Sequence, residues 1–398
     1  MTPIRLLTYS TLFPNAAQPN HGIFVENRLR HLLATGGATA TVLAPVPFFP
    51  SAAPVFGRWA AFARVPRQEV RHGIEVHHPR FLAIPRLGEP VAPFLLAAAS
   101  RMALRRLIAG GVGFDLIDAH YVYPDGVAAV RLGAAFGVPV VITARGSDVT
   151  QLPDHAIPRR LIAGALRRAD ALIAVSSALG ERLVALGADP AKVTVLRNGV
   201  DAGQFAPADR AAARATLGLD AAPTLISVGA LVARKGHDRT IAAMPSLPGV
   251  RLLIVGEGTE RERLAADIAR LGLADRVRLL GARPHAELPG YYGAADAMVL
   301  ASSREGWANV LLESMACGTP VVASNIPGNP EVVRERAAGV IVRENSPGGI
   351  AAGVRDLFAD PPDRAATRAY AERFGWEETS AGQLRVFRDV LARASARS

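Results

Sequence analysis

Short apolar runs alternate with longer amphipathic stretches along the whole chain. Most of the stretches between the runs have the length and apolar spacing of helices. Twelve runs are predicted to be strands: residues 4–9, 40–44, 116–119, 139–143, 171–175, 193–196, 224–228, 251–255, 277–280, 297–301, 320–323 and 340–342. Because strands that alternate with helices form parallel sheets covered on both faces, the pattern predicts an α/β fold.

The alternation occurs twice, once on either side of residue 200. A chain of 398 residues is too long for one ordinary core and suits two domains of roughly 150 to 200 residues each. The turn-rich segment RNGVDAGQFAP, residues 197–207, is the predicted linker between them. We therefore expect two doubly wound parallel-sheet domains, over residues 1–200 and 201–375, followed by an amphipathic helix over residues 376–394.

Ligands of open parallel sheets bind beyond the carboxyl ends of the strands. Two such domains that face each other are expected to form a central cleft lined by loops that follow strands. The chemistry of the protein should therefore lie on those loops.

The composition indicates a globular protein with a full core, since 50% of the residues are hydrophobic and 20% are charged. The single cysteine, Cys317, excludes an intramolecular disulfide and lies in an apolar stretch typical of a buried side chain. The start of the chain lacks the features of a signal peptide, so no export is expected. The longest uncharged apolar run, residues 90–100, contains two prolines and is too short to span a membrane.

Positive charge is concentrated in the first half of the chain. Residues 1–200 contain 21 Lys and Arg against 12 Asp and Glu, within a formal net charge of +10 for the whole chain. Such a distribution suits an anionic membrane surface or an anionic substrate. The alternative is a general bias toward arginine, because the only lysines are Lys192 and Lys235. The sequence leaves both explanations open.

Two glutamates lie in the stretch SREGWANVLLESMACGTPVV, residues 303–322, directly after the predicted strand 297–301. Asn309 is the expected N-cap of a short helix in this stretch. Free backbone N–H groups at the start of such a helix favour a phosphate. Glu305 precedes the helix and Glu313 lies in its first turns, so we expect them to contact two different parts of one ligand. A capped surface helix with solvated glutamates is the alternative.

At these residues the chain resembles the retaining glycosyltransferases of family 4, which have the two-domain GT-B fold. Their motif is a glutamate, seven residues, a second glutamate and a turn containing alanine and glycine, as in EGWANVLLESMACGTPVV here. The resemblance extends over essentially the whole chain. It implies two Rossmann-like domains facing a central cleft, the first for the acceptor and the second for the nucleotide sugar, with residues 376–398 packing back on the first domain.

The resemblance also assigns donor contacts to this stretch. Glu313 would bind the ribose of the nucleotide, and Glu305 would contact the transferred sugar near its anomeric carbon. Sugar hydroxyls and phosphate would be held by the backbone of Gly306, Trp307, Ala308, Asn309 and Val310.

A second candidate donor site is SVGALVARKGHD, residues 227–238, which follows a predicted strand. Basic side chains here can neutralise a diphosphate leaving group, where negative charge accumulates as the glycosidic bond breaks. In the family this loop has an arginine and a Lys-Gly pair, and the two basic residues grip the diphosphate. Lys235 matches the family lysine, but Ala230 stands where the arginine usually is, so Arg234 is the expected substitute. A solvated Arg-Lys pair is the alternative.

Loops of the first half carry further candidates. Gly22, in FPNAAQPNHGIFVENRLRHL, permits a close approach between backbone and ligand, and the corresponding family loop faces the donor phosphates. His120, in DLIDAHYVYPDG, ends a predicted strand, and the resemblance places it near the donor sugar as a catalytic candidate; a structural histidine is the alternative. On the acceptor side the candidates, all in TARGSD, are Arg145, Ser147 and Asp148.

The loop GARPHAELPGYY, residues 281–292, follows another predicted strand. In the family the backbone of this loop contacts the nucleotide base, which makes Ala282 and Arg283 candidates. Backbone contacts leave no side-chain record of which base is bound.

Two arginine-rich segments interleave basic and apolar side chains, at residues 56–73 and 158–168. Such segments can lie at an anionic membrane surface, which makes peripheral membrane contact a candidate property. Ordinary amphipathic surface helices have the same composition, so the sequence does not decide between them.

We therefore expect a metal-independent, retaining hexosyltransferase of the cytoplasm, acting at the inner face of the membrane. Its donor would be a UDP- or GDP-linked sugar and its acceptor a glycan or a polyprenyl- or other lipid-linked hydroxyl, in exopolysaccharide or glycolipid synthesis. No cofactor is expected, and no metal, because the sequence contains neither an Asp-x-Asp pair nor a His/Cys cluster with zinc spacing. Lys235 would supply the positive charge instead.

Three other functions fit the sequence less well. An oxidoreductase would use Gly256 and Gly258, but the dinucleotide fingerprint requires a third glycine where Arg261 stands. A non-catalytic protein that binds nucleotide sugars would be expected to lack one of the two glutamates or the lysine. Nucleic-acid binding has no motif to accompany the positive charge, so no nucleic-acid partner is expected.

Overall fold

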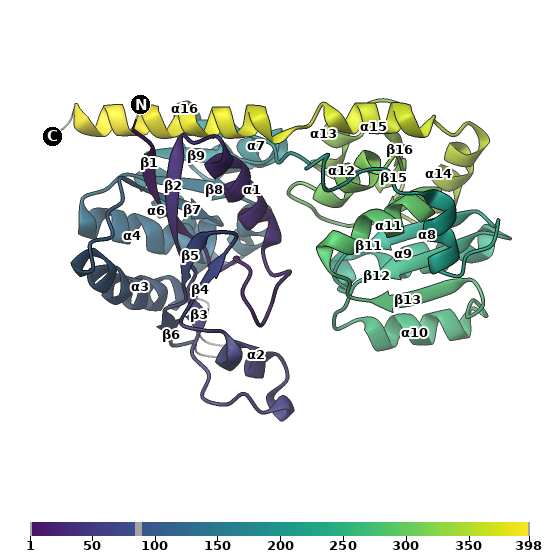
Figure 1. Ribbon diagram of the computed structural model, residues 1–398, viewed down its shortest axis with the longest axis horizontal. Coiled ribbons are helices and arrows are strands. Elements are labelled where there is room, and N and C mark those ends of the chain that lie inside the picture. Colours follow the sequence, from purple (N-terminus) through teal and green to yellow (C-terminus); the bar gives the residue numbers. More distant parts are fainter. Residues whose placement is uncertain (1, 84–89, 397–398) are drawn as a thin grey trace. The chain divides into compact units, whose positions relative to one another are not determined.

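The computed structural model describes residues 2–83 and 90–396. It divides into two compact units, which Figure 1 shows with their elements labelled. Unit 1 comprises Met1–Arg197 and Glu377–Ser398, and unit 2 comprises Asn198–Trp376. The chain therefore enters unit 2 once and returns to unit 1 through its last helix.

Unit 1 is built on a sheet of eight strands in the order β10-β9-β8-β7-β1-β2-β5-β4. Its strands are β1 (Ile4–Tyr9), β2 (Ala38–Leu43), β4 (Gln68–Arg71), β5 (Ile74–His77), β7 (Leu116–His120), β8 (Val140–Ala144), β9 (Ala171–Ala174) and β10 (Val193–Val195). All neighbouring strands are parallel except β4 and β5. A separate parallel pair consists of β3 (Val46–Pro47) and β6 (Arg80–Phe81).

Helices cover both faces of this sheet. On one face, α1 (Ile23–Ala34) and α16 (Trp376–Ser395) bury apolar side chains against the strands, so the last helix of the chain completes the core of unit 1. On the other face lie α3 (Ala92–Ala109), α4 (Val127–Phe136) and α6 (Ala156–Arg168), which pack against one another. The remaining helices are α2 (Arg58–Arg64), α5 (Ser147–Thr150) and α7 (Ser177–Ala185).

Unit 2 has a fully parallel sheet of six strands in the order β13-β12-β11-β14-β15-β16. Its strands are β11 (Thr224–Val228), β12 (Arg251–Val255), β13 (Val277–Gly281), β14 (Ala297–Leu300), β15 (Val321–Ser324) and β16 (Gly339–Val342). One face is covered by α9 (His237–Ala243), α10 (Arg261–Arg270) and α14 (Pro347–Ala359). The other helices are α8 (Arg210–Thr216), α11 (Leu288–Ala294), α12 (Asn309–Ala316), α13 (Asn329–Val332) and α15 (Arg364–Glu372).

Each sheet has a point where its winding direction reverses. In unit 2 the chain runs outward from β11 to β13 and then returns to β14 on the opposite side of β11. In unit 1 the same reversal separates β1 from β7. Loops that follow the two strands at a reversal diverge and leave room for a ligand, so these are the positions where binding loops are expected.

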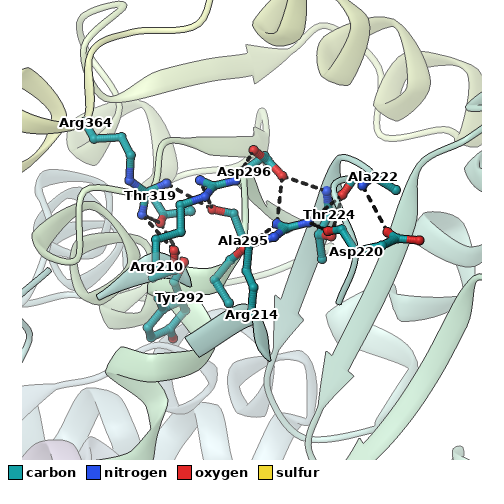
Figure 2. Close-up of polar contacts among 12 residues, drawn as sticks. Arg210, Arg214, Asp220, Ala222, Thr224, Tyr292, Ala295, Asp296, Thr319 and Arg364 are labelled. Carbon is teal, nitrogen blue, oxygen red and sulfur yellow. Dashed lines mark hydrogen bonds and ion pairs between the residues drawn. The ribbon is translucent and has the colours of Figure 1, made fainter. Parts of the chain in front are cut away.

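A cluster of arginines holds the opposite, amino-terminal end of the unit 2 sheet (Figure 2). Asp296, just before β14, accepts hydrogen bonds from the Thr224 backbone N–H at 2.8 Å and from Arg210 Nη2 at 2.6 Å. Arg214 forms an ion pair with the same carboxylate at 3.5 Å, and Arg364 donates to Thr319 Oγ1 at 2.8 Å. These arginines fasten α8 and α15 to the sheet and are structural.

All twelve predicted strands are confirmed, with ends that differ by at most two residues. The β4–β5 hairpin was not predicted, because the segment QEVR has a single apolar residue and its turn is not Asn-Gly or Asp-Gly. The turn residues His72 and Gly73 have φ values of 49° and 78°, the left-handed conformation that such two-residue turns require. The arginine-rich segment 56–73 contains α2 and β4.

Candidate functional site

The loop after β11 places Lys235 beside the loop after β14. Residues 233–235 form one turn of 3-10 helix, and Gly236 follows with φ of 69°. A Cβ atom on Gly236 would lie 2.0 Å from the Ala301 carbonyl oxygen, so only glycine allows the two loops to come this close. The Ser303 N–H also donates to the Arg234 carbonyl at 2.8 Å. Backbone contacts therefore fix where Lys235 stands.

Glu305 is the ion-pair partner of Lys235. Its Oε1 lies 2.6 Å from Lys235 Nζ and accepts a hydrogen bond from Ser302 Oγ at 2.7 Å. Arg234 Nη1 is 3.9 Å from Oε2 and its side chain is about half exposed. Burial alone would raise the pKa of Glu305, but Lys235 outweighs burial and lowers this pKa below its usual value. Glu305 is therefore an ionised, largely buried carboxylate.

Glu313 lies on α12 and has different neighbours. Its Oε1 is 3.1 Å from His285 Nε2, and its Oε2 accepts a hydrogen bond from the Tyr292 hydroxyl at 3.1 Å. Burial is the first effect on His285 and opposes its protonation, but Glu313 outweighs it and raises the pKa of His285 above its usual value. The two glutamates therefore belong to two separate sets of protein contacts, and their expected contacts with two parts of one ligand stay a prediction.

The start of α12 differs in one respect from the prediction. Ala308 occupies the N-cap position, and Asn309 is the first residue of the helix, so the expected N-cap role of Asn309 is wrong. The side chain of Asn309 instead accepts a hydrogen bond from the Asn198 amide at 3.2 Å. Gly306, Trp307 and Ala308 are buried in the loop that leads into the helix, and Val310 is partly buried in its first turn.

Ala282 and Arg283 lie in the loop after β13, as predicted. Ala282 is exposed, and Arg283 Nη2 donates to the Leu280 carbonyl at 3.0 Å. His285, which contacts Glu313 from this loop, was not among the candidates of the sequence analysis. Its position after a strand was a signal, but its contact with Glu313 could not be read from the sequence.

Gly256 and Gly258 have a packing role. A Cβ atom on Gly256 would lie 1.8 Å from the Gly229 carbonyl oxygen, and one on Gly258 would lie 2.3 Å from that of Leu231. The loop after β12 thus packs directly against the loop that carries Lys235. Protein contacts alone account for both glycines, which leaves the oxidoreductase alternative without support.

In unit 1 the loops after β1 and β7 are joined by hydrogen bonds. Ser10 Oγ donates to the His120 carbonyl at 3.1 Å, and the backbone N–H of Thr11 donates to Asp125 at 2.6 Å. Gly22 has φ of 68°, and a Cβ atom there would lie 2.3 Å from the Leu12 carbonyl oxygen. Packing within its own loop thus requires a glycine at position 22, and the expected approach of this loop to the donor phosphates stays a prediction.

His120 is buried at the end of β7 and both of its ring nitrogens are engaged. Nε2 lies 3.2 Å from Asp118 Oδ2, and Arg145 Nη2 lies 2.7 Å from Nδ1. Because the arginine can only donate, Nδ1 accepts and the proton of the neutral ring is on Nε2. Burial lowers the pKa of His120, in keeping with a neutral ring. The candidates His120 and Arg145 are therefore in direct contact.

Asp148 organises the loop that contains the other acceptor-side candidates. Its buried carboxylate accepts hydrogen bonds from the backbone N–H groups of Val122, Arg145 and Gly146. The Ser147 hydroxyl lies 2.5 Å from the Tyr121 hydroxyl. Tyr121 has φ of 86°, a strained conformation for a non-glycine residue, and such strain is often found at functional sites.

Unit 1 also contains an apolar-lined cavity of about 250 Å³. Pro47, Phe62 and Phe81 lie on its apolar side, while Thr11 and His21 from the loop after β1 provide polar groups. The cavity is thus bordered by the same loop that contacts the end of β7.

An exposed aromatic surface adjoins this cavity. Of eleven exposed large hydrophobic side chains among the described residues, seven lie within residues 48–94. We define the aromatic surface as Phe48, Phe49, Val55, Phe56, Trp59 and Phe62, which lie on and around α2. The Phe49 ring is in edge or tilted contact with the rings of Phe56 and Trp59, and the Trp59 ring with that of Phe62. Phe62 belongs to both the surface and the cavity. In the other arginine-rich segment, 158–168, Ile162 and Leu166 are buried in unit 1.

Two absences concern metals and membranes. Within residues 2–83 and 90–396, no group of three or more His, Cys, Asp or Glu side chains could hold a metal ion. In the same described part of the chain, no helix combines the length and apolar character needed to cross a bilayer.

Comparison with known proteins accounts for both units. Residues 28–204 match the family described as Glycosyltransferase Family 4, and residues 209–374 match the family described as Glycosyl transferases group 1. A relative from Segniliparus rotundus, named D-inositol 3-phosphate glycosyltransferase, is 34% identical over 361 residues, which cover 85% of this chain and 80% of the relative. The acceptor in that name is a small molecule, inositol 3-phosphate. The name therefore gives no support to the expected role in exopolysaccharide synthesis.

Solved structures match the fold over nearly the whole chain. Sucrose-phosphate synthase from Thermosynechococcus elongatus has a TM-score of 0.82 at 23% identity and covers 99% of this chain and 100% of its own. Anabaena HepE in complex with UDP has a TM-score of 0.73 at 22% identity, with coverage of 97% and 100%. The expectation of two Rossmann-like domains of the GT-B type is confirmed.

Proposed function

The chain belongs to glycosyltransferase family 4, and on this premise we propose that it transfers a sugar from a UDP- or GDP-linked donor to an acceptor hydroxyl with retention of configuration. The observation that carries the proposal is the ion pair between Lys235 Nζ and Glu305 Oε1 at 2.6 Å. It lies where the winding of the unit 2 sheet reverses, the position at which open parallel sheets bind ligands.

Lys235 would stabilise the negative charge that develops on the diphosphate as the bond to the anomeric carbon breaks. A bond from that carbon to the acceptor oxygen forms on the same face, and the acceptor proton passes to the leaving phosphate. Arg234 is close enough to Glu305 to add a second positive charge. Glu305 would hold Lys235 in position and place negative charge near the anomeric carbon, while Glu313 binds the ribose.

His120 enters this proposal as a residue that shapes the loop after β7. Nε2, which carries the proton of the neutral ring, faces Asp118, and Nδ1 accepts from Arg145, so both nitrogens are engaged by protein groups. Its contact with Arg145 would keep the loop in its strained conformation beside Tyr121.

Substitution at the ion pair tests the site. Lys235→Ala and Glu305→Gln are each expected to reduce turnover by about 100-fold or more, the usual effect of removing a group that stabilises developing charge. Ser303→Ala, in the same loop, serves as the matched control and should retain activity. Turnover with UDP- and GDP-linked sugars is measured by release of the nucleoside diphosphate, and the anomeric configuration of the product by NMR. Wild-type turnover in both ion-pair variants would contradict the assignment.

For the acceptor we propose a lipid-linked hydroxyl compound. The apolar cavity beside the loop after β1 and the adjoining aromatic surface favour an acceptor with an apolar chain. A small phosphorylated polyol is the second candidate, favoured by the name of the Segniliparus relative. Transfer to a polyprenyl-phosphate-linked sugar and to inositol 3-phosphate, assayed side by side with the same donor, distinguishes the two.

We further propose that the aromatic surface contacts the anionic inner face of the cytoplasmic membrane, together with the exposed arginines Arg64 and Arg67 that follow it in the chain. A double substitution, Phe48→Ser with Phe56→Ser, should abolish sedimentation with vesicles of phosphatidylcholine and phosphatidylglycerol. The matched control is Ile157→Ser with Val184→Ser, two exposed apolar residues elsewhere in unit 1. Equal sedimentation of both double variants would overturn the proposed membrane contact.

A further inference from the structure

We infer that His285, held by Gln204, is a positioning residue that orients the Glu313 carboxylate toward the ribose of the donor. The inference rests on the proposed function, because it takes Glu313 as the residue that binds the ribose. His285 lies in the loop 281–292, where the sequence analysis named only Ala282 and Arg283 as candidates, and Gln204 lies in the predicted linker 197–207.

Both oxygens of the Glu313 carboxylate are occupied by protein donors. His285 approaches Oε1 and Tyr292 approaches Oε2, each at 3.1 Å. The glutamate side chain is only about a tenth exposed, and those of His285 and Tyr292 are largely or fully buried. Two donors on opposite oxygens prevent the carboxylate from rotating, yet each oxygen retains a further lone pair for a ligand.

Gln204 determines which nitrogen of His285 carries the proton. The Gln204 side-chain amide nitrogen lies 3.1 Å from His285 Nδ1 and can donate to it. An accepting Nδ1 leaves the proton of the neutral ring on Nε2, directed at Glu313. The direction of each hydrogen bond from Gln204 to the carboxylate is therefore set.

The turn that carries Gln204 is itself fixed. Asp201 Oδ1 accepts hydrogen bonds from the backbone N–H groups of Gly203 and Gln204, both at 2.9 Å. Arg368 Nη1 donates to the Phe205 carbonyl at 2.8 Å, and the Phe205 ring meets the His285 ring edge-on with centroids 5.0 Å apart. His285 is consequently held by both a hydrogen bond and an aromatic contact.

A carboxylate that binds a vicinal diol must present its oxygens in one orientation, because two hydroxyls at fixed spacing approach it together. Loss of the His285 donor should allow the Glu313 carboxylate group to rotate. Binding of the ribose diol should weaken, whereas binding of a nucleotide that lacks the diol should not change. A residue that merely supports the fold would weaken every ligand alike. This difference separates positioning from general stabilisation.

The test compares nucleotides with and without the ribose hydroxyls. Binding of UDP and of 2′,3′-dideoxy-UDP, and of the corresponding guanosine pair, is measured by calorimetry on the full chain. The variants are His285→Phe, which keeps the ring but removes the donor, His285→Gln, which can restore a donor, Gln204→Leu, and Glu313→Gln as the reference. Thermal unfolding of each variant checks that it is folded.

We expect the wild-type chain to prefer the ribonucleotide by about tenfold or more, as for a hydrogen bond to a charged group. His285→Phe should remove most of this preference without changing affinity for the dideoxy nucleotide, Gln204→Leu should remove part of it, and His285→Gln should restore it. If Glu313→Gln abolishes the preference but His285→Phe retains it, only the role of His285 is overturned. If Glu313→Gln also retains it, the ribose assignment in the proposed function fails as well.

Discussion

Replacing Lys235 with methionine tests whether Lys235 and Glu305 act as one electrostatic pair. The two side chains are 13% and 9% exposed, so methionine would leave an ionised carboxylate with little access to water. Removing one partner of a buried pair costs about 3–5 kcal/mol of unfolding free energy. Glu305 would keep the Ser302 hydrogen bond, and the half-exposed Arg234 stays 3.9 Å away, so we expect about 3 kcal/mol.

The pH dependence gives this prediction a direction. Without Lys235, burial dominates and the folded-state pKa of Glu305 rises above its unfolded value. The loss of unfolding free energy caused by Lys235→Met is then fully present at pH 8. It shrinks as the pH falls through the raised pKa of Glu305, because the carboxylate takes up a proton more readily in the folded state than in the unfolded state. The loss is measured by urea unfolding at pH 8 and pH 5, with hydrogen exchange of unit 2 peptides as the readout. The double variant with Glu305→Gln should recover most of the loss. A loss below ~1 kcal/mol that does not change with pH would refute the reasoning.

Three further predictions concern unit 2. Gly236→Ala should lower the unfolding free energy by more than ~2 kcal/mol, because its Cβ would lie 2.0 Å from the Ala301 oxygen. The control Gly249→Ala, at a similar φ of 73° but with open space around it, should lower it by only about 1 kcal/mol. Chemical denaturation of both variants measures the difference. Burial lowers the pKa of His237 to about 4, so the unfolded chain binds a proton first and stability should fall by up to about 1.4 kcal/mol per pH unit between pH 6.5 and about 4; His237→Gln should flatten that part of the urea profile. Turnover should persist in excess EDTA, and a loss that Mg²⁺ or Mn²⁺ restores would contradict the role assigned to Lys235.

The sequence predicted the sheets well because buried parallel strands are short apolar runs that are visible without tertiary information. The β4–β5 hairpin escaped because its outer strand is polar and its His-Gly turn is uncommon. Asn309 fits the general preference for N-caps, but the loop before α12 places Ala308 at that position and turns the Asn309 side chain toward Asn198. Local propensity was outweighed there by a tertiary hydrogen bond.

The candidate site was predictable in kind but not in its contacts. Lys235 and Glu305 are 70 positions apart, and only the strand order, with β14 beside β11, brings their loops together. His285 was missed for a related reason, because its importance comes from a neighbour on α12 and from Gln204 at the start of unit 2. A motif search finds residues that recur with fixed spacing, whereas these partners are assembled by the fold.

Gly256 and Gly258, in the loop after β12, constrain the neighbouring loop after β11, which carries Lys235. Gly256 lies so close to the Gly229 carbonyl that any side chain would force the loop after β11 to move. The two loops are also joined by a hydrogen bond from the Leu231 N–H to the Glu257 carbonyl at 2.9 Å. Because Lys235 is placed by the backbone of its loop, a displacement begun at Gly256 would reach its ammonium group. A glycine pair that superficially suggests a dinucleotide fingerprint is thus explained by the close packing of its loop against the loop that carries Lys235.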